Sequence, residues 1–586
     1  MNITSKDTIH IEESFKVAAG PGAGKTDFLV GHIKNVVRHL NRLSCARKVA
    51  CITYTNTGVS TILQRLGKNA SEKVEVSTIH SFLYKNIVKP YSSFIPLEYG
   101  VNCKLMTGHD DFIVSRKNLN EWLSNSVFDL LKHPNSRNQL LMMPEQFRAL
   151  KNWVTSMQCV YKKGKVSFLC DATKSSYPTG TGEKTFKSSN LKILTEHLID
   201  LKKIYWKTGK IHHDDVLFFS VILIEKYPFI LEVLRAKFPY IFIDEYQDTS
   251  PVQAHIVDKI KEKETIVGVI GDKAQSIFSF QGADPTLFSN FKVDAECEYT
   301  IVENYRSSGE IVRFLNVLRT DIKQEICNGR SGNSVYIIVG NRVSAYQKAR
   351  ALCGNITGVK IESLSRDNIT SNAMKKDIGN SQIMVDILKT YENADSNSER
   401  RHYVLEAIRS IELSKSGKFK EAIKGLERLF RKTPNPKKQA LHMLIMLLTQ
   451  YSLYSGKNLL NFYELAATFS FEKLSAVRAG KVKNFYTNTP YQSIAICMNI
   501  PEDTSEHITI HKSKGNQFEN VFVVGTKHIK EFLLNSSLEN EEHRIAYVAF
   551  SRAKERLFIQ FDESNFSRDD ELALQTKFDM LQVIRI

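Results

Sequence analysis

The stretch Phe15-Lys-Val-Ala-Ala-Gly-Pro-Gly-Ala-Gly-Lys-Thr26 decides the fold, because it joins an apolar run to a glycine-rich loop and then to a helical pattern. The run Phe15–Ala18 predicts a strand, and the pattern from Asp27 to about Leu40 predicts a helix. A glycine-rich loop in this setting is typical of a P-loop, where backbone N–H groups and the helix N-terminus hold a phosphate. A purely structural turn is the alternative, but the ending Gly24-Lys25-Thr26 favours the phosphate site.

The loop residues form the predicted nucleotide-binding set, which is Ala19, Gly20, Pro21, Gly22, Ala23, Gly24, Lys25 and Thr26. We expect Lys25 to reach the β- and γ-phosphates of a nucleoside triphosphate and the Thr26 hydroxyl to bind Mg²⁺. Ala19 stands where the general motif has glycine, and its side chain is small enough for the loop to close.

A second pattern, Tyr240-Ile-Phe-Ile-Asp244-Glu245, places two acids at the end of an apolar strand. Beside a P-loop, Asp244 is expected to hold the metal and Glu245 to polarise the attacking water. Two acids at a strand end can also be a solvated cap, which is the alternative. Gln275 follows the next predicted strand and is a candidate sensor of the γ-phosphate or of its water.

Short apolar runs that end in polar or turn residues recur along the chain, as buried parallel strands do. They are Lys48–Thr53, Tyr240–Ile243, Thr265–Ile270, Val335–Val339, Val521–Val524 and Leu557–Ile559. Strands that alternate with helices predict doubly wound parallel sheets and so an α/β fold. Two largely helical stretches, 86–211 and 366–499, interrupt this alternation of strands and helices. The first contains a polar, loop-like patch at 174–190.

Length, charge and cysteines limit the class of protein. A chain of 586 residues suits about three or four domains. Lysine and arginine exceed the acids by 17, which suits a polyanionic partner, although a basic soluble protein is the alternative. The nine cysteines are scattered, so we expect no metal framework and reduced thiols in a cytoplasm. Val216–Ile224 and Ala440–Leu448 are about half a membrane span, and we expect both to be buried helices.

Seven motifs, in order, resemble those of the UvrD/Rep/PcrA branch of superfamily 1 helicases. They are Thr53-Tyr-Thr-Asn56, Thr78-Ile-His-Ser-Phe82, Ile243-Asp-Glu-Tyr-Gln-Asp-Thr249, Gly271-Asp-Lys-Ala-Gln-Ser-Ile-Phe-Ser-Phe-Gln-Gly-Ala283, Glu303-Asn-Tyr-Arg-Ser307, Thr509-Ile-His-Lys-Ser-Lys-Gly515 and the segment Glu542 to Lys554. The two helical stretches match nothing in that branch that can be quoted.

The resemblance implies roles for further residues. Arg306 and Arg552 would be arginine fingers that reach the γ-phosphate, and Tyr305 would stack on the base of the nucleotide. The residues implied to contact DNA are Asn56, His80, Phe278, Phe280 and His511. Stacking on bases suits the two phenylalanines, although core packing is the alternative for them and a satisfied histidine is the alternative for His80.

Four departures from the family pattern bear on these roles. No glutamine precedes Gln64, so the upstream glutamine that reads adenine is missing. Gln281 stands where the family has an arginine, which would remove a positive charge near the γ-phosphate. Gln517 stands where it has a glutamate that meets the ribose. The second helical stretch, of about 130 residues, is short for an accessory domain.

The resemblance implies two RecA-like domains, each split by a helical insertion. The expected boundaries are 1–85 and 212–300 for the first motor domain, 86–211 for its insertion, 301–365 and 500–586 for the second motor domain, and 366–499 for a reduced accessory insertion. The implied activity is ATP- and Mg²⁺-dependent movement, 3′ to 5′, on single-stranded or forked DNA.

The biological setting stays open between alternatives. About 30 residues follow Lys554, too few for a nuclease domain, and the layout resembles the compact UvrD-like subunits of bacterial defence systems such as the Gabija helicase subunit. A nuclease subunit is therefore an expected partner. A stand-alone repair helicase, a DNA sensor whose NTPase gates a nuclease without unwinding, and a non-motor P-loop signalling ATPase are the rivals. The motifs after residue 301 argue against the signalling ATPase.

Overall fold

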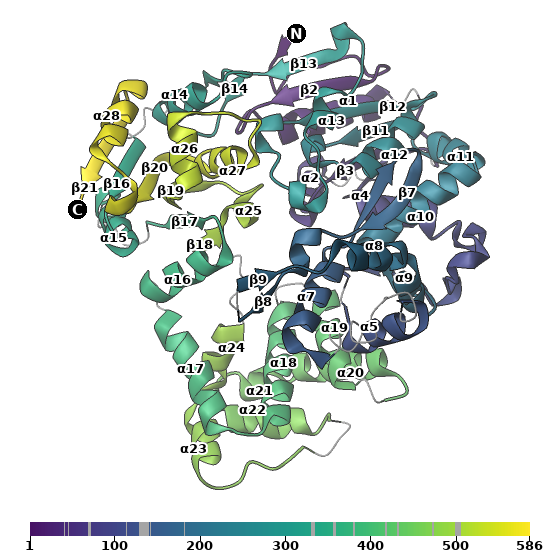
Figure 1. The fold of residues 1–586 in the computed structure, drawn as a ribbon, viewed down its shortest axis with the longest axis vertical. Helices are drawn as coiled ribbons and strands as arrows, with labels where there is room; N and C mark the ends of the chain where they lie inside the picture. The colour runs from purple at the N-terminus through teal and green to yellow at the C-terminus, as the bar shows by residue number, and fades with distance from the viewer. Residues whose placement is uncertain are drawn as a thin grey trace.

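The computed structural model has an α/β fold built on two parallel sheets, which confirms the predicted class (Figure 1). The residues that it describes are 1–39, 42–44, 46–67, 72–112, 114–127, 140, 142–180, 182–327, 329, 335–354, 359–378, 381–415, 419–430, 433–470, 474–498 and 506–586. The boundary expected at 499 and 500 lies outside these residues. Of the described helices, none is long and apolar enough to cross a membrane.

The first sheet has seven parallel strands and carries the P-loop on a central strand. In spatial order its strands are β1 (Asn2–Ile3), β13 (Glu298–Ile301), β2 (Phe15–Ala19), β12 (Ile266–Gly271), β11 (Tyr240–Ile243), β3 (Val49–Thr53) and β4 (Val74–Thr78). Parallel strands bring their carboxyl ends to one edge of the sheet. The loops that follow β2, β11 and β12 therefore meet there, and these loops contain the P-loop, the acid pair and Gln275.

Helices on both faces bury this sheet. They are α1 (Lys25–His39), α2 (Asn56–Leu66), α4 (Ile79–Leu83), α10 (His213–Lys226), α11 (Phe229–Lys237) and α12 (Pro251–Lys261). Helix α1 begins at the P-loop lysine, and Asp27 in its first turn and Arg38 in its last turn suit the helix dipole. The predicted buried helix at Val216–Ile224 lies within α10 and is buried on nearly every side, as expected.

The second sheet has six parallel strands, drawn from both sides of the second insertion. In order they are β18 (His507–Thr509), β17 (Ile361–Ser365), β19 (Phe518–Val524), β20 (Ala553–Phe561), β16 (Val335–Val339) and β21 (Leu581–Arg585). Its helix α27 (Glu541–Phe550) packs against the turn Lys273–Gln275, which follows β12 of the first sheet, and α14 (Gly309–Leu318) lies beside α27. We call the bodies around the two sheets the first and the second motor domain.

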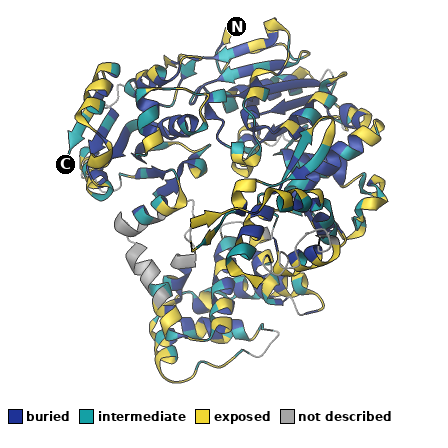
Figure 2. Ribbon diagram, in the orientation of Figure 1, coloured by how far each residue is buried: buried dark blue, intermediate teal, exposed yellow. Residues whose placement is uncertain are grey.

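The two insertions differ in structure. The second is helical in its described part, from α16 (Asn368–Ile378) to α24 (Tyr491–Met498). The helices from α17 (Ser381–Ala394) onward pack around their own core, whereas α16 packs against the second sheet, where its Met374 joins a core cluster of that sheet. Its helix α20 (Pro436–Thr449) contains the run Ala440–Leu448, but Leu441 and Ile445 are exposed, so the expectation of a fully buried helix is wrong for that face. Figure 2 shows the alternation of buried and exposed residues on these helices.

The first insertion adds two antiparallel hairpins to its helices α5 (Arg116–Trp122), α7 (Pro144–Thr155), α8 (Ser188–Glu196) and α9 (Leu198–Trp206). The hairpins are β6–β7 (Gln158–Lys162, Lys165–Leu169) and β8–β9 (Tyr177–Thr179, Gly182–Lys184). The second hairpin lies in the patch predicted to be a loop. The Thr179 hydroxyl donates to the Gly182 carbonyl at 2.6 Å and closes a turn that the polar composition did not predict.

Candidate functional site

The P-loop lies directly against the second motor domain. Gly22 and Gly24 adopt left-handed backbone conformations, with φ of 77° and 81°, which glycine adopts without strain. A Cβ at Gly22 would lie 2.6 Å from Cβ of Arg306 and 2.8 Å from Oδ1 of Asn304. The Lys25 ammonium group donates to the Ala19 carbonyl at 3.3 Å, across the loop. The loop is thus a cradle of backbone groups closed by the other domain.

The acid pair follows β11, at the sheet edge beside the P-loop. The Asp244 N–H donates to the Ile52 carbonyl at 2.8 Å, and burial together with the neighbouring Glu245 raises the Asp244 pKa to about 7. Burial also opposes ionisation of Glu245, but Lys25 and Lys514 hold its pKa below the ordinary value. Glu245 has a φ of 56°, a strained conformation for a residue with a side chain, of the kind that occurs at functional sites.

Arg306 and Arg552 bring two guanidinium groups into the same buried space. Burial lowers the pKa of Arg306 to about 9 and that of Arg552 to about 10, and Arg552 contributes to the lowering at Arg306. Among the described residues, Nε of Arg306 has no hydrogen-bond partner, while Nη1 donates to the Ser551 carbonyl at 3.0 Å. Two neighbouring cations, Arg552 buried and Arg306 partly buried and incompletely paired, fit a polyanion such as a triphosphate.

The remaining predicted residues of the cleft suit a nucleotide and a divalent cation. The Thr26 hydroxyl and the Asp244 carboxylate are oxygen donors of the type that Mg²⁺ prefers. Tyr305 is 39% exposed, and its N–H donates to the Gly22 carbonyl at 3.0 Å, so its ring lies at the rim of the loop. Gln275 is buried, and its Oε1 accepts a hydrogen bond from Nη2 of Arg552 at 2.8 Å.

A row of four rings lies beside this cleft, and we call Tyr54, Phe278, Phe280 and His511 the aromatic track. Tyr54 and Phe278 stack at 4.9 Å between ring centroids, with an interplanar angle of 21°. Phe278 and Phe280 lie 5.9 Å apart, and His511 meets Phe280 edge-on at 5.4 Å. Phe280 is 59% exposed, which excludes core packing for it, whereas Phe278 is half-buried against the core of the second domain.

Comparison with known families agrees with this geometry. The model of the UvrD/REP helicase N-terminal domain matches residues 2–296, and that of the UvrD-like helicase C-terminal domain matches residues 359–564. The chain belongs to the UvrD-like helicase family. Together the two matches include the P-loop, the acid pair, the aromatic track and Arg552.

Individual relatives of this UvrD-like helicase share low identity over long stretches. The chain is 22% identical to an ATP-dependent DNA helicase Rep of Buchnera aphidicola, over 93% of this chain and 88% of that protein. It is 24% identical to a probable DNA helicase II homolog of Mycoplasma pneumoniae, over 96% and 83%. It is also 24% identical to the Gabija protein GajB of Bacillus cereus, over 56% of this chain and 50% of that protein.

Two residues predicted to contact DNA, Asn56 and His80, are not members of the aromatic track. Asn56 is exposed at the start of α2, next to Tyr54 in the chain. The ring contacts of His80 are with His213 at 5.2 Å and His109 at 6.5 Å. Burial and the two neighbouring histidines lower the His80 pKa to about 3, so a nucleic-acid contact of His80 would involve a neutral imidazole.

Lys514 joins the track to the cleft of the UvrD-like helicase, and the sequence analysis gave it no role. Its ammonium group donates to the Asp248 carboxylate and, at 2.6 Å, to the Gln275 carbonyl. The same group lies 4.7 Å from the centroid of the Phe278 ring. Lys514 lies in the quoted motif Thr509–Gly515, so its position in a family motif could have marked it as a functional residue. One side chain thus contacts both the segment that contains Gln275 and a residue of the aromatic track.

Gln281 and Tyr54 contact each other on the side of the aromatic track. Gln281 was expected only to remove a positive charge near the γ-phosphate, and its exposed side chain accepts a hydrogen bond from the Tyr54 hydroxyl. Tyr54 belongs to a quoted motif from which only Asn56 was selected. The stack of Tyr54 on Phe278 could not be found from sequence, because about 220 residues separate the two.

Proposed function

We propose that this UvrD-like helicase is a motor that couples hydrolysis of ATP, with Mg²⁺, to 3′ to 5′ movement on single-stranded DNA. The observation that carries the proposal is the direct connection, through Lys514, of a nucleotide cleft to an aromatic track whose outermost ring, Phe280, is exposed. A stacking surface grips bases without regard to sequence, which a motor that moves along a strand requires. The DNA helicases among its relatives support the choice of DNA.

The residues of the cleft then have the following roles. Lys25, Arg306 and Arg552 hold the phosphates, and the two arginines complete the site only when the domains meet. Glu245 takes the proton of the attacking water, and Gln275 orients that water. Thr26 and Asp244 would hold Mg²⁺, which would supply positive charge to the phosphates. Tyr305 stacks on the base of the nucleotide.

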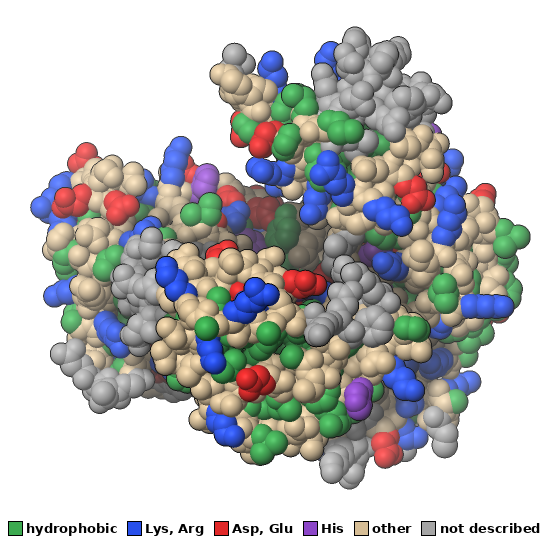
Figure 3. Space-filling view, turned by 90° about the horizontal axis from the view of Figure 1, so that it is seen from below, with side chains coloured by type: hydrophobic (Ala, Val, Ile, Leu, Met, Phe, Trp, Pro, Cys, Tyr) green, Lys and Arg blue, Asp and Glu red, His purple; other side chains and the backbone are tan. Residues whose placement is uncertain are grey.

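DNA passes over the aromatic track in this proposal. Asn56, His80 and His511 contact the strand, and Phe278 and Phe280 stack on its bases. The net charge of +17 suits a partner with a phosphate backbone. Seen from below, the molecule is hollowed at its centre, with lysine and arginine side chains on both sides of the hollow (Figure 3). We also propose the domain boundaries given above.

The similarity to the Gabija protein GajB supports a second candidate, in which the chain senses DNA and gates a partner nuclease of a bacterial defence complex. Hydrolysis stimulated by DNA is common to both candidates, so only strand separation distinguishes them. For the first candidate, the motor, the biological setting is either a defence complex or a repair complex.

Unwinding of tailed duplexes tests the proposal. A duplex of 20 base pairs with a single 3′ tail, one with a single 5′ tail and a fork are each incubated with ATP and the wild-type chain. We expect separation of the 3′-tailed and forked substrates, and none with the Glu245→Gln variant. Separation of the 5′-tailed duplex alone would contradict the polarity. Hydrolysis stimulated by single strands without any separation would favour the sensor.

A further inference from the structure

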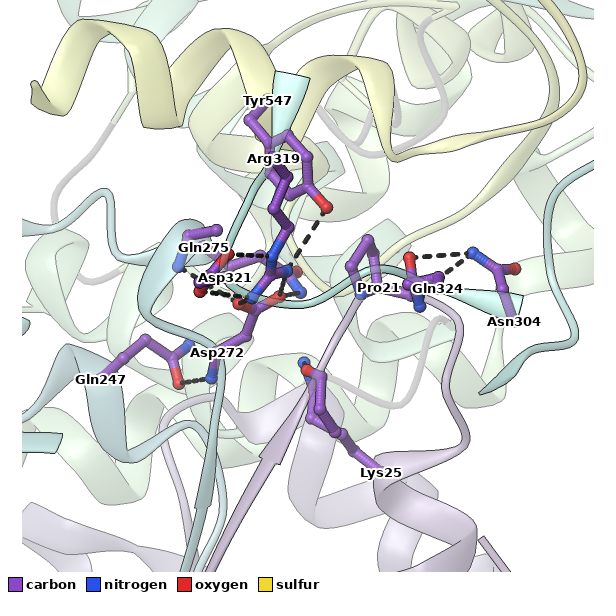
Figure 4. A network of polar contacts seen from close by, with 12 residues as sticks. Pro21, Lys25, Gln247, Asp272, Gln275, Asn304, Arg319, Asp321, Gln324 and Tyr547 are labelled. Carbon is purple, nitrogen blue, oxygen red and sulfur yellow. Dashed lines mark hydrogen bonds and ion pairs between the residues drawn. The ribbon is translucent and has the colours of Figure 1, made fainter. Parts of the chain in front are cut away.

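A buried ion pair crosses the interface between the two motor domains. Arg319, the residue after α14, donates to the carboxylate of Asp272, the residue after β12, at N···O distances of 2.8 and 3.1 Å. The two side chains are 1% and 0% exposed. Arg319 lies in none of the quoted motifs. Figure 4 shows Arg319 reaching Asp272 from the second domain, beside Tyr547.

Two groups of the second domain fix the direction of the Arg319 guanidinium. Asp321 accepts hydrogen bonds from Nε at 2.6 Å and from Nη2 at 3.1 Å. The Tyr547 hydroxyl lies 3.4 Å from Nη1. Since a guanidinium is a rigid planar fork, these contacts direct its remaining donor positions at Asp272.

The Asp272 carboxylate also holds the carboxamide of Gln275. Nε2 of Gln275 donates to Oδ2 of Asp272 at 2.6 Å. An ionised carboxylate only accepts, and a carboxamide has one donor end and one acceptor end. Asp272 therefore selects the orientation in which Oε1 of Gln275 points into the cleft, where Arg552 donates to it. An acceptor at this position is what orientation of an attacking water requires.

The charge of Arg319 keeps Asp272 in its accepting form. Burial acts to raise the Asp272 pKa, yet this pKa lies below its ordinary value because Arg319, and after it Lys25, faces the carboxylate. Tyr547 and Arg552 also face it. A protonated Asp272 would donate a hydrogen bond, and the Gln275 oxygen would then turn away from the cleft.

We propose that Arg319 is a positioning residue that reports domain closure to the hydrolytic centre by fixing the orientation of Gln275. The inference rests on the proposed function, in which Gln275 orients the attacking water. Arg319 reaches Asp272 only when the two domains are together, so the correct orientation of Gln275 is tied to closure. This role is separate from that of Arg306 and Arg552, which face the phosphates themselves.

A double-mutant cycle tests the inference, because residues that act through one another give non-additive losses. Steady-state hydrolysis with saturating single-stranded DNA is measured for the wild type, Arg319→Met, Gln275→Ala and the double variant. We expect Arg319→Met to lower kcat by about 10- to 100-fold in the wild-type background, with KM for ATP changed by less than about threefold. In the Gln275→Ala background, the same substitution should lower kcat by less than about threefold.

Two more variants separate positioning from folding. Asp321→Ala removes a half-exposed partner that aims Arg319, and should lower kcat in the same non-additive way but by less. Arg313→Met is the control, because Arg313 lies on α14 but is exposed and pairs with Glu310 on the same helix. Thermal melts accompany every variant. If Arg319→Met does not fold, the cycle is run with Asp321→Ala and Gln275→Ala.

The outcomes are distinct. Additive losses in the two backgrounds, or an unchanged kcat in folded Arg319→Met and Asp321→Ala, overturn the inference while leaving the motor intact. Full activity of Gln275→Ala removes the proposed role of Gln275 and the inference with it. Hydrolysis that DNA does not stimulate in the wild type contradicts the proposed function, and the cycle can still be measured on basal hydrolysis.

Discussion

The nucleotide cleft and the aromatic track lie side by side, but the cleft is lined by charged side chains and the track by aromatic rings. The cleft is ionic, and burial lowers the pKa values of Arg306 and Arg552 in it. The first domain contributes Lys25 and the acid pair, and the second contributes the two arginines. The track consists of rings, and its outermost ring, Phe280, is largely exposed. The cleft is suited to one polyanion in one geometry, whereas the track is suited to any base. Substitutions in the cleft should therefore lower ATP hydrolysis itself, whereas substitutions in the track should lower its stimulation by DNA.

The largest effect is expected from removal of an arginine that only the second domain supplies. Arg306→Ala should lower kcat for ATP by about 10³- to 10⁵-fold, because the charge that develops on the γ-phosphate loses a partner. Steady-state hydrolysis measures this loss. Arg313→Ala, on an exposed face of α14, is the matched control and should keep wild-type turnover. Comparable rates in the two variants would remove Arg306 from the cleft.

Glu245→Gln should separate binding from chemistry in the cleft. The substitution keeps the shape of the side chain and loses the base, so we expect kcat to fall by about 10²- to 10⁴-fold while ATP still binds. Nucleotide affinity is measured by fluorescence titration, beside single-turnover hydrolysis. Glu232→Gln, at an exposed position of α11, is the control. Turnover near that of the wild type would refute the assignment of the base.

Nucleotide choice should show the smallest effect, because no glutamine lies upstream of the P-loop. A stacking contact with Tyr305 tolerates any base. We expect kcat/KM for ATP to exceed that for GTP or CTP by less than about 10²-fold, whereas a site that hydrogen-bonds its base rejects others by about 10⁴- to 10⁵-fold. Hydrolysis of the three nucleotides with saturating DNA measures this. A strict preference for ATP would mean that another group reads adenine.

The sequence predicted the cleft better than the track for a physical reason. The P-loop and the acid pair are short segments whose function follows from a local turn or strand end, so Lys25 and Asp244 could be assigned from spacing. The track needs rings from three separate segments, and Tyr54 was missed because its partner Phe278 is distant in the chain.

Other features had no local signal at all. Arg319 sits at the end of an ordinary helix, and its ion pair with Asp272 exists only because two domains meet. The hairpin in the polar patch at 174–190 depends on a turn within a segment whose composition is that of a loop. The strands of both sheets were largely predicted, because strands buried on both faces are continuous apolar runs.

The central claim is that the track transmits DNA binding to the cleft, and the double variant Phe278→Ala/Phe280→Ala tests it. Hydrolysis is measured with and without single-stranded DNA, beside DNA affinity and a thermal melt, with Phe229→Ala as an exposed aromatic control. We predict unchanged basal hydrolysis, loss of most DNA stimulation and weaker binding by about 1–3 kcal/mol for each lost stack. Early melting, as expected when a buried phenylalanine is truncated at a cost of about 3–5 kcal/mol, would mean that the half-buried Phe278 ring is part of the core. An unchanged melt with full DNA stimulation would contradict the claim.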